Sequence, residues 1–79
     1  MLMQVRIVSE YHDNKEAKIV ADVLEADNRT APNDLFVKSY SDENKVFSEI
    51  KASKIETLIA TVDDLLCSQR LAEDVLGET

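Results

Sequence analysis

Few side chains in this chain have the chemistry of an active site. It holds one histidine, His12, and one cysteine, Cys67. His12 falls at a predicted strand-to-helix junction, where we expect a solvent-exposed turn residue. Cys67 falls inside a predicted helix, where we expect a small, partly buried side chain and not a reactive thiol. A single thiol allows no intrachain disulfide, and one histidine with one cysteine is too small a set for a metal site.

The acidic residues do not indicate catalysis either. Asp63 and Asp64 are adjacent on a predicted helix, so their carboxylates diverge by about 100° and cannot act on one substrate. The single glycine excludes the glycine-rich loops that hold phosphates, which need several. We therefore expect no catalytic residue and no cofactor, which leaves a binding or assembly module in place of an enzyme.

The charge balance bounds the choice of partner. The chain has 79 residues, with 16 acidic and 9 basic side chains and a net charge of −7. Such a surface repels phosphate and disfavours autonomous binding of RNA or DNA. It either suits a basic partner or serves as a solvated face that aids solubility. Because there is no charged-then-apolar leader and no run of about 20 apolar residues, we expect no membrane partner and a cytoplasmic protein.

Periodic patterns predict the elements that must position any binding surface. They are a strand at 3–11, a helix at 14–26, strands at 35–41 and 45–52 joined by a polar turn, and a long helix at 53–76. Asp13 followed by Glu16 predicts an N-cap for the first helix. Ser53 and Glu56 predict a capping box for the second. Gly77 suits the left-handed position after a helix end.

The two helices are predicted to be amphipathic. The apolar side of the first helix comprises Ala17, Val20, Val23 and Leu24. The apolar stripe of the second covers an arc of about 140° and comprises Ile55, Leu58, Ile59, Val62, Leu65, Leu66, Ala72 and Leu76. Leu71 and Val75 form a second, weaker apolar patch behind that stripe, near the end of the long helix.

The order of elements predicts one domain of α+β class spanning 1–79. A right-handed crossover places the first two strands parallel. The third strand then fits between them, giving a three-stranded antiparallel sheet with two helices on one face, in the order β-α-β-β-α. Exposed edges of so small a sheet favour pairing with another chain.

The second face of this sheet is predicted to be uncovered. It carries Phe36, Tyr40 and Phe47 among Arg6, Lys38, Glu49 and Lys51. The aromatic rings either form part of a partner surface or pack against the aliphatic stems of the lysines and the arginine. Both readings remain open.

Three stretches of the sequence together resemble a known family. The runs 11–17 (YHDNKEA), 24–28 (LEADN) and 52–66 (ASKIETLIATVDDLL) are similar to the CTAG/Pcc-type family, the small dimerising subunits of the KEOPS complex. The resemblance extends over nearly the whole chain and includes the order of elements. It implies a single KEOPS small-subunit-like domain in a cytoplasmic, archaeal-type protein.

The resemblance implies a non-catalytic role in tRNA processing. KEOPS makes threonylcarbamoyladenosine beside the anticodon of tRNAs that read codons starting with A. Its small subunit docks through its helices onto the transferase subunit and joins sheets with itself, so that tRNA is met only within the complex. Partner contacts are then expected at Ile19 and Ala26 of the first helix and at Leu71 and Val75 of the second.

Further candidate partner contacts, at Asp27, Asn28, Ile59 and Asp63, match or depart from the family pattern. Asp27 and Asn28 match its Asp-Asn, and Asp63 takes the place of an Asn in the long helix. Ala26 replaces the usual proline, and Ile59 stands where the family often has arginine. These departures support one alternative, a diverged paralogue that heterodimerises with the standard small subunit and caps it. A second alternative is a stand-alone RNA-binding module that uses the aromatic sheet face.

Overall fold

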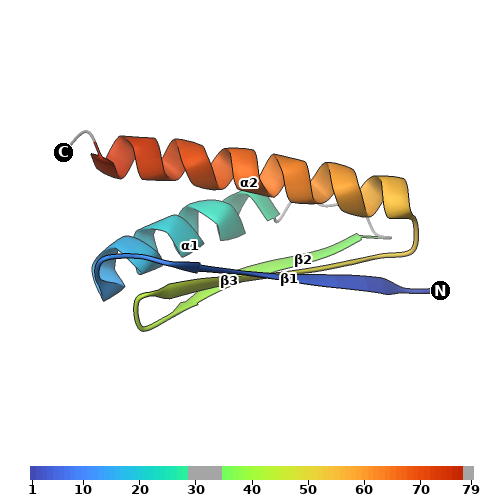
Figure 1. The fold of residues 1–79 in the computed structure, drawn as a ribbon, viewed down its shortest axis with the longest axis horizontal. Helices are drawn as coiled ribbons and strands as arrows, with labels where there is room; N and C mark the ends of the chain where they lie inside the picture. Colours follow the sequence, from blue (N-terminus) through green and yellow to red (C-terminus); the bar gives the residue numbers. More distant parts are fainter. Residues whose placement is uncertain (29–34, 78–79) are drawn as a thin grey trace.

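The computed structural model describes residues 1–28 and 35–77, and it has the predicted order of elements (Figure 1). These are β1 (Met3–Glu10), α1 (Asn14–Asn28), β2 (Leu35–Asp42), β3 (Lys45–Ala52) and α2 (Ile55–Gly77). Within that part of the chain, the helices and strands end within two residues of their predicted bounds. Differences of this size are normal for element ends.

The three strands form one sheet in the order β1-β3-β2. The central strand β3 is antiparallel to both neighbours, with Ile50 opposite Val5 on one side and opposite Val37 on the other. Both helices cover the same face of the sheet (Figure 1). The predicted α+β fold is therefore confirmed, including the parallel relation of β1 and β2.

The core lies between the sheet and the helices. Its buried apolar residues are Ala17, Val20, Ala21, Leu24, Val46, Ile50, Ala52, Leu58, Leu65 and Ala72. On β3 the small residues Ser48 and Ala52 are both buried. The Ser48 hydroxyl lies 2.9 Å from that of Ser39 on β2, so the two hydroxyl groups satisfy each other beneath the helices.

The helix ends follow local chemistry only in part. The Asp13 carboxylate accepts the Glu16 backbone N–H at 2.8 Å, which confirms the predicted N-cap of α1. The second helix begins at Ile55, where the Lys54 carbonyl accepts the first helical N–H, so the predicted cap at Ser53 is wrong. Gly77 is the last residue of α2 and its φ is not positive, so its predicted left-handed role is also wrong.

The buried faces of the helices differ from the prediction. In α1, Val23 is exposed and Ala21 is buried in its place. In α2, three residues of the predicted stripe are about half exposed: Ile55, Ile59 and Leu66. The buried line of α2 instead passes through Leu58, Leu65, Gln69 and Ala72. Cys67, predicted to be partly buried, is exposed, whereas His12 is exposed as predicted.

Candidate partner-binding surfaces

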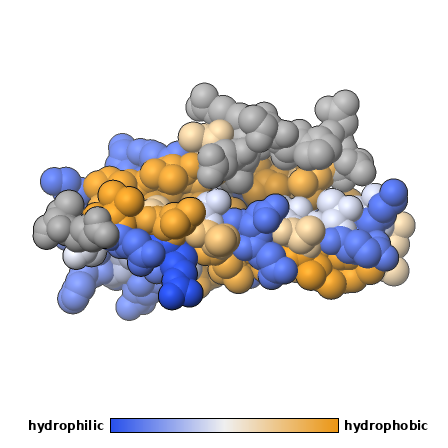
Figure 2. Space-filling view, turned by 90° about the horizontal axis from the view of Figure 1, so that it is seen from above, coloured by the Kyte–Doolittle hydropathy of each residue, from blue (hydrophilic) through white to orange (hydrophobic). Residues whose placement is uncertain are grey.

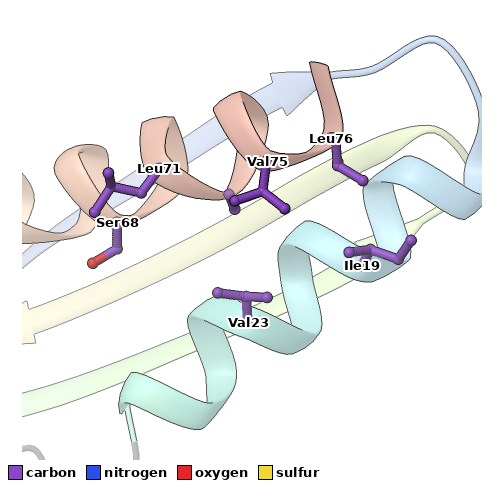
Figure 3. Close-up of a pocket in the computed structure, with 7 residues that line it drawn as sticks. Ile19, Val23, Ser68, Leu71, Val75 and Leu76 are labelled. Atoms are coloured by element: carbon purple, nitrogen blue, oxygen red, sulfur yellow. The ribbon is translucent and has the colours of Figure 1, made fainter. Parts of the chain in front are cut away.

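An apolar groove separates the two helices near the C-terminal end of α2. It is lined by Ile19 and Val23 of α1 and by Ser68, Leu71, Ala72, Val75 and Leu76 of α2, and its volume is about 280 Å³. Figure 3 shows the side chains of both helices directed into the space between them. The groove is open to solvent on its outer side, where Leu71 and Val75 are 64% and 66% exposed.

Helical spacing explains how these residues meet. Ile19 and Val23 are four residues apart on α1, as Leu71 and Val75 are on α2, so each pair forms a short ridge on one side of its helix. The ridges face each other because α1 is anchored to the sheet by the buried Val20 and Leu24. What results is a continuous apolar surface that residues 1–28 and 35–77 leave uncovered, which is typical of a partner-binding surface.

The groove contains three of the predicted contact residues. Ile19, Leu71 and Val75 line it together. Val23 and Ser68 also line it but were not predicted as contacts. The sequence did contain a sign that Val23 belongs to this surface, because Val23 lies four residues after Ile19 on the same helix. We instead assigned Val23 to the core, and so did not predict it as a contact.

The remaining predicted contacts do not belong to the groove. Ala26 is exposed further along α1, and Ile59 and Asp63 are exposed in the N-terminal half of α2. The side chains of Asp27 and Asn28 lie outside the described part of the structure. The structure therefore does not unite all predicted contacts in one surface.

A second apolar surface lies on the other flank of α2. Successive helix residues are about 100° apart around the axis, which places Leu66 and Ile59 about 60° and 80° from Gln69, on the side away from the groove. Gln69 contacts β1, so this flank is the one above β1. Figure 2 looks onto the helix layer and shows hydrophobic surface near both ends of the molecule, with hydrophilic residues between.

A polar cluster fixes α2 against β1. The Gln69 side-chain amide donates to the Ser9 hydroxyl at 2.6 Å and to the Tyr11 hydroxyl at 2.8 Å. The Tyr11 hydroxyl in turn donates to the Glu73 carboxylate at 2.5 Å. Burial, together with the hydrogen bond to Glu73, raises the pKa of Tyr11 well above its usual value, although the Gln69 hydrogen bond opposes the shift. The cluster orients α2 and holds a neutral phenol at neutral pH.

The uncovered face of the sheet carries stacked rings and cations. The rings of Tyr40 and Phe47 stack with their centroids 5.3 Å apart. Arg6 lies 4.9 Å above the Phe47 ring, and Lys51 lies 5.3 Å above the Phe36 ring. The sequence left two interpretations of these rings, a partner surface or packing against basic side chains. The contacts agree with the second, because the cationic side chains lie over the rings. Phe36 is nonetheless 47% exposed, so the face is not closed to a partner.

The described residues were searched for a metal-binding cluster and for a membrane-spanning helix, and they contain neither. Within residues 1–28 and 35–77, no group of three or more His, Cys, Asp or Glu side chains could hold a metal ion. No helix in that part of the chain is long and apolar enough to cross a bilayer. What the site can do chemically is to bind apolar side chains of another protein.

Fold and surfaces together define a small α+β assembly module with two separate apolar contact surfaces. The family comparison makes this more specific. The sequence profile described as "Transcription factor Pcc1" matches residues 4–77, so the chain belongs to the Pcc1 family. Pcc1 is a family of non-catalytic KEOPS subunits, and the resemblance noted in the sequence is confirmed.

A solved structure shares the fold. A chain in the crystal structure of a binary Gon7–Pcc1 complex superposes with a TM-score of 0.85 at 17% sequence identity, over 95% of this chain and 93% of that chain. At this identity the match concerns the fold alone. A comparison with curated protein sequences gives no significant match.

Proposed function

We propose that this protein is a non-catalytic subunit of a KEOPS-type complex. In this role it binds the transferase subunit through its helices, dimerises through its sheet, and supports threonylcarbamoyladenosine modification of tRNA. It acts in the cytoplasm of an archaeal-type cell and meets tRNA only within the complex. Membership in the Pcc1 family supports the assignment of this protein to such a complex. The apolar groove between α1 and α2 is the observation that supports the transferase contact.

The groove suits a helix of the partner. An amphipathic helix inserts apolar side chains spaced by three or four residues into such a groove. The four ridge residues Ile19, Val23, Leu71 and Val75 would then complete a small helical bundle with the partner. Acidic side chains near the groove, Asp22 and Asp74, are exposed, and they favour a partner helix with basic residues beside its apolar stripe.

The test combines two double variants with a binding measurement. Leu71→Ala/Val75→Ala removes one ridge of the groove, whereas Ile59→Ala/Leu66→Ala removes matched apolar surface from the opposite flank of α2. Binding to the transferase subunit of the same organism is measured by isothermal titration calorimetry. We expect the groove variant to weaken binding about 30- to 700-fold, since truncation of each of the two apolar contacts costs on the order of 1–2 kcal/mol, or about 2–4 kcal/mol together.

The flank variant should bind the transferase subunit within about twofold of the wild type. Both groove residues are largely exposed in the free chain, so melting of the groove variant should change by only a few degrees, on the order of the shift that 0.5 kcal/mol causes in a domain of this size. Equal loss of binding in both variants, or a loss of binding and stability together in the groove variant, would contradict the assignment.

The capping paralogue is the second candidate, and two exposed positions favour it. Ile59 is 56% exposed where the family often has arginine, and Ala26 is exposed where it usually has proline. In this case the protein would pair with a standard small subunit and prevent that subunit from forming a homodimer. Light scattering after size-exclusion chromatography, on a mixture of this protein with a standard small subunit, distinguishes the two roles. A capping subunit would convert the homodimer of the standard subunit into a 1:1 heterodimer.

A further inference from the structure

The β2 edge of the sheet is in contact with a charged side chain from a helix. In the middle of this strand, the Ser39 backbone N–H donates to the Glu25 carboxylate of α1 at 2.7 Å. Since Ser39 stands opposite Ser48 of the central strand, this N–H leaves β2 on the side away from β3. Backbone groups alternate in direction along an antiparallel strand, so the N–H groups of Val37 and Ser41 also point outward.

This contact covers the middle of an edge strand. Ser39 is 4% exposed and is the buried residue of β2. By contrast, every residue of the other edge strand, β1, is at least partly exposed. The backbone of an edge strand ordinarily meets water or another chain. The burial of Ser39 therefore marks a position of the edge that the fold itself has closed.

Helical spacing explains how Glu25 reaches the edge. Leu24 is fully buried under α1, and its two neighbours in sequence lie about 100° to either side of it around the helix axis. Val23 is thereby directed towards the groove with α2, whereas Glu25 lies on the opposite flank, beside β2. The carboxylate is thus separate from the groove and can be altered without changing a groove residue.

A carboxylate at this position opposes the addition of a strand. An added strand pairs through its backbone carbonyl groups, and one of them would have to replace the Glu25 oxygen on the Ser39 N–H. A hydrogen bond to a charged acceptor is stronger than one to a neutral carbonyl. The displaced carboxylate would also lose solvent between α1 and the new strand, which is unfavourable for a charge. Charged side chains that point inward at an edge are one means by which sheet proteins prevent unwanted pairing.

We propose that Glu25 is a guard residue that keeps further strands off the β2 edge, so that the sheet ends at β2. It occupies the central one of the outward N–H groups of Val37, Ser39 and Ser41, and so interrupts the row to which a strand would add. This role goes beyond the proposed KEOPS-type function and does not depend on it. It also narrows the expectation from the sequence, in which the sheet edges favour pairing with another chain.

Two substitutions of Glu25 and a matched control test this role. Glu25→Ala removes the acceptor, and Glu25→Gln keeps a neutral, weaker one. Asp22→Ala removes the same charge from an exposed position of α1. Light scattering over a concentration series measures assemblies larger than the wild-type species. We expect Glu25→Ala to form them at concentrations at least tenfold lower than Asp22→Ala does, with Glu25→Gln between the two.

A second substitution separates strand addition from aggregation of unfolded chains. Ser41→Pro removes a neighbouring outward N–H, and it breaks no ladder hydrogen bond within the chain. In Glu25→Ala/Ser41→Pro we expect the larger assemblies to disappear, because proline blocks the edge although it does not restore the lost hydrogen bond. Assemblies that persist in this double variant would overturn the proposal. Equal assembly of Glu25→Ala and Asp22→Ala would overturn it as well.

Amide hydrogen exchange on the wild-type protein gives a readout that does not depend on the folding of a variant. The Ser39 amide should exchange at least tenfold more slowly than the Ser41 amide of the same edge, and equal rates would overturn the proposal. Transferase binding is measured separately through Leu71 and Val75, and Glu25→Ala should leave it within about twofold of the wild type. The guard role and the docking role can therefore fail independently.

Discussion

Gln69 is the one buried polar residue of α2, and its removal should destabilise the protein strongly. The residue is 5% exposed, and its amide makes the two hydrogen bonds that connect α2 to β1. In Gln69→Ala, the Ser9 and Tyr11 hydroxyl groups lose their donor and a small cavity forms beside them. The variant thus isolates the contribution of the polar cluster to the position of α2.

The magnitude follows from the contacts. Each lost hydrogen bond costs about 1 kcal/mol, and truncation of the buried side chain adds a cavity term, so we expect a loss of about 2–3 kcal/mol in the free energy of unfolding. In a domain of 60–100 residues, 1 kcal/mol corresponds to about 4–8 °C in melting temperature. The melting temperature should therefore fall by roughly 10–20 °C.

Urea denaturation measures this effect, and a double-mutant cycle measures the coupling within the cluster. The cycle comprises the wild type, Gln69→Ala, Tyr11→Phe and the double variant. Arg70→Ala, at the exposed next residue, serves as a separate control. We expect a coupling free energy of about 1 kcal/mol between Gln69 and Tyr11, and a change below about 0.5 kcal/mol for the control. If Gln69→Ala resembled the control, or the coupling were zero, the hydrogen bonds would not hold α2 to the sheet.

Two further predictions concern pH and RNA. The pKa of Tyr11 is raised in the folded state, so its contribution to stability is complete below the unfolded value of 10.0 and is lost as pH rises above it. Tyr11→Phe should flatten that decline in melts between pH 8 and about 11, and an unchanged slope would argue against a raised pKa for this partly buried, hydrogen-bonded phenol. The isolated protein, with its net charge of −7, should show no measurable affinity for tRNA in filter binding at about 150 mM salt. Micromolar binding that Phe36→Ala abolishes would instead favour an RNA-binding sheet face. Ile19→Ala, on the helix side of the molecule, serves as the control.

The fold was predictable because each element carries a strong local pattern. Period-two alternation marks the strands, and Asp13 marks the start of α1 with a cap that the structure contains. The short connection between β2 and β3 leaves little choice but a hairpin. A right-handed crossover then places β3 in the centre, as the strand order confirms.

The surfaces were less predictable, because a helical pattern gives the apolar arc of a helix but not the part of it that faces the sheet. Apolar residues of α2 extend far around its axis, and the rotation of the helix is fixed by tertiary contacts. One of these is Gln69, a polar residue that no hydrophobic pattern would place in a core. Its hydrogen bonds to β1 help to set that rotation, which turns Ile59 and Leu66 outwards on one flank.

The same rotation explains why so small a chain leaves two apolar surfaces. A helix that buries the line of Leu58, Leu65 and Ala72 against one sheet cannot also bury both of its flanks. One flank faces α1 across the groove, and the other overhangs the β1 edge. Since two flanks on opposite sides of a helix cannot be covered by one compact partner, the geometry favours a subunit that connects two neighbours over one that binds a single partner.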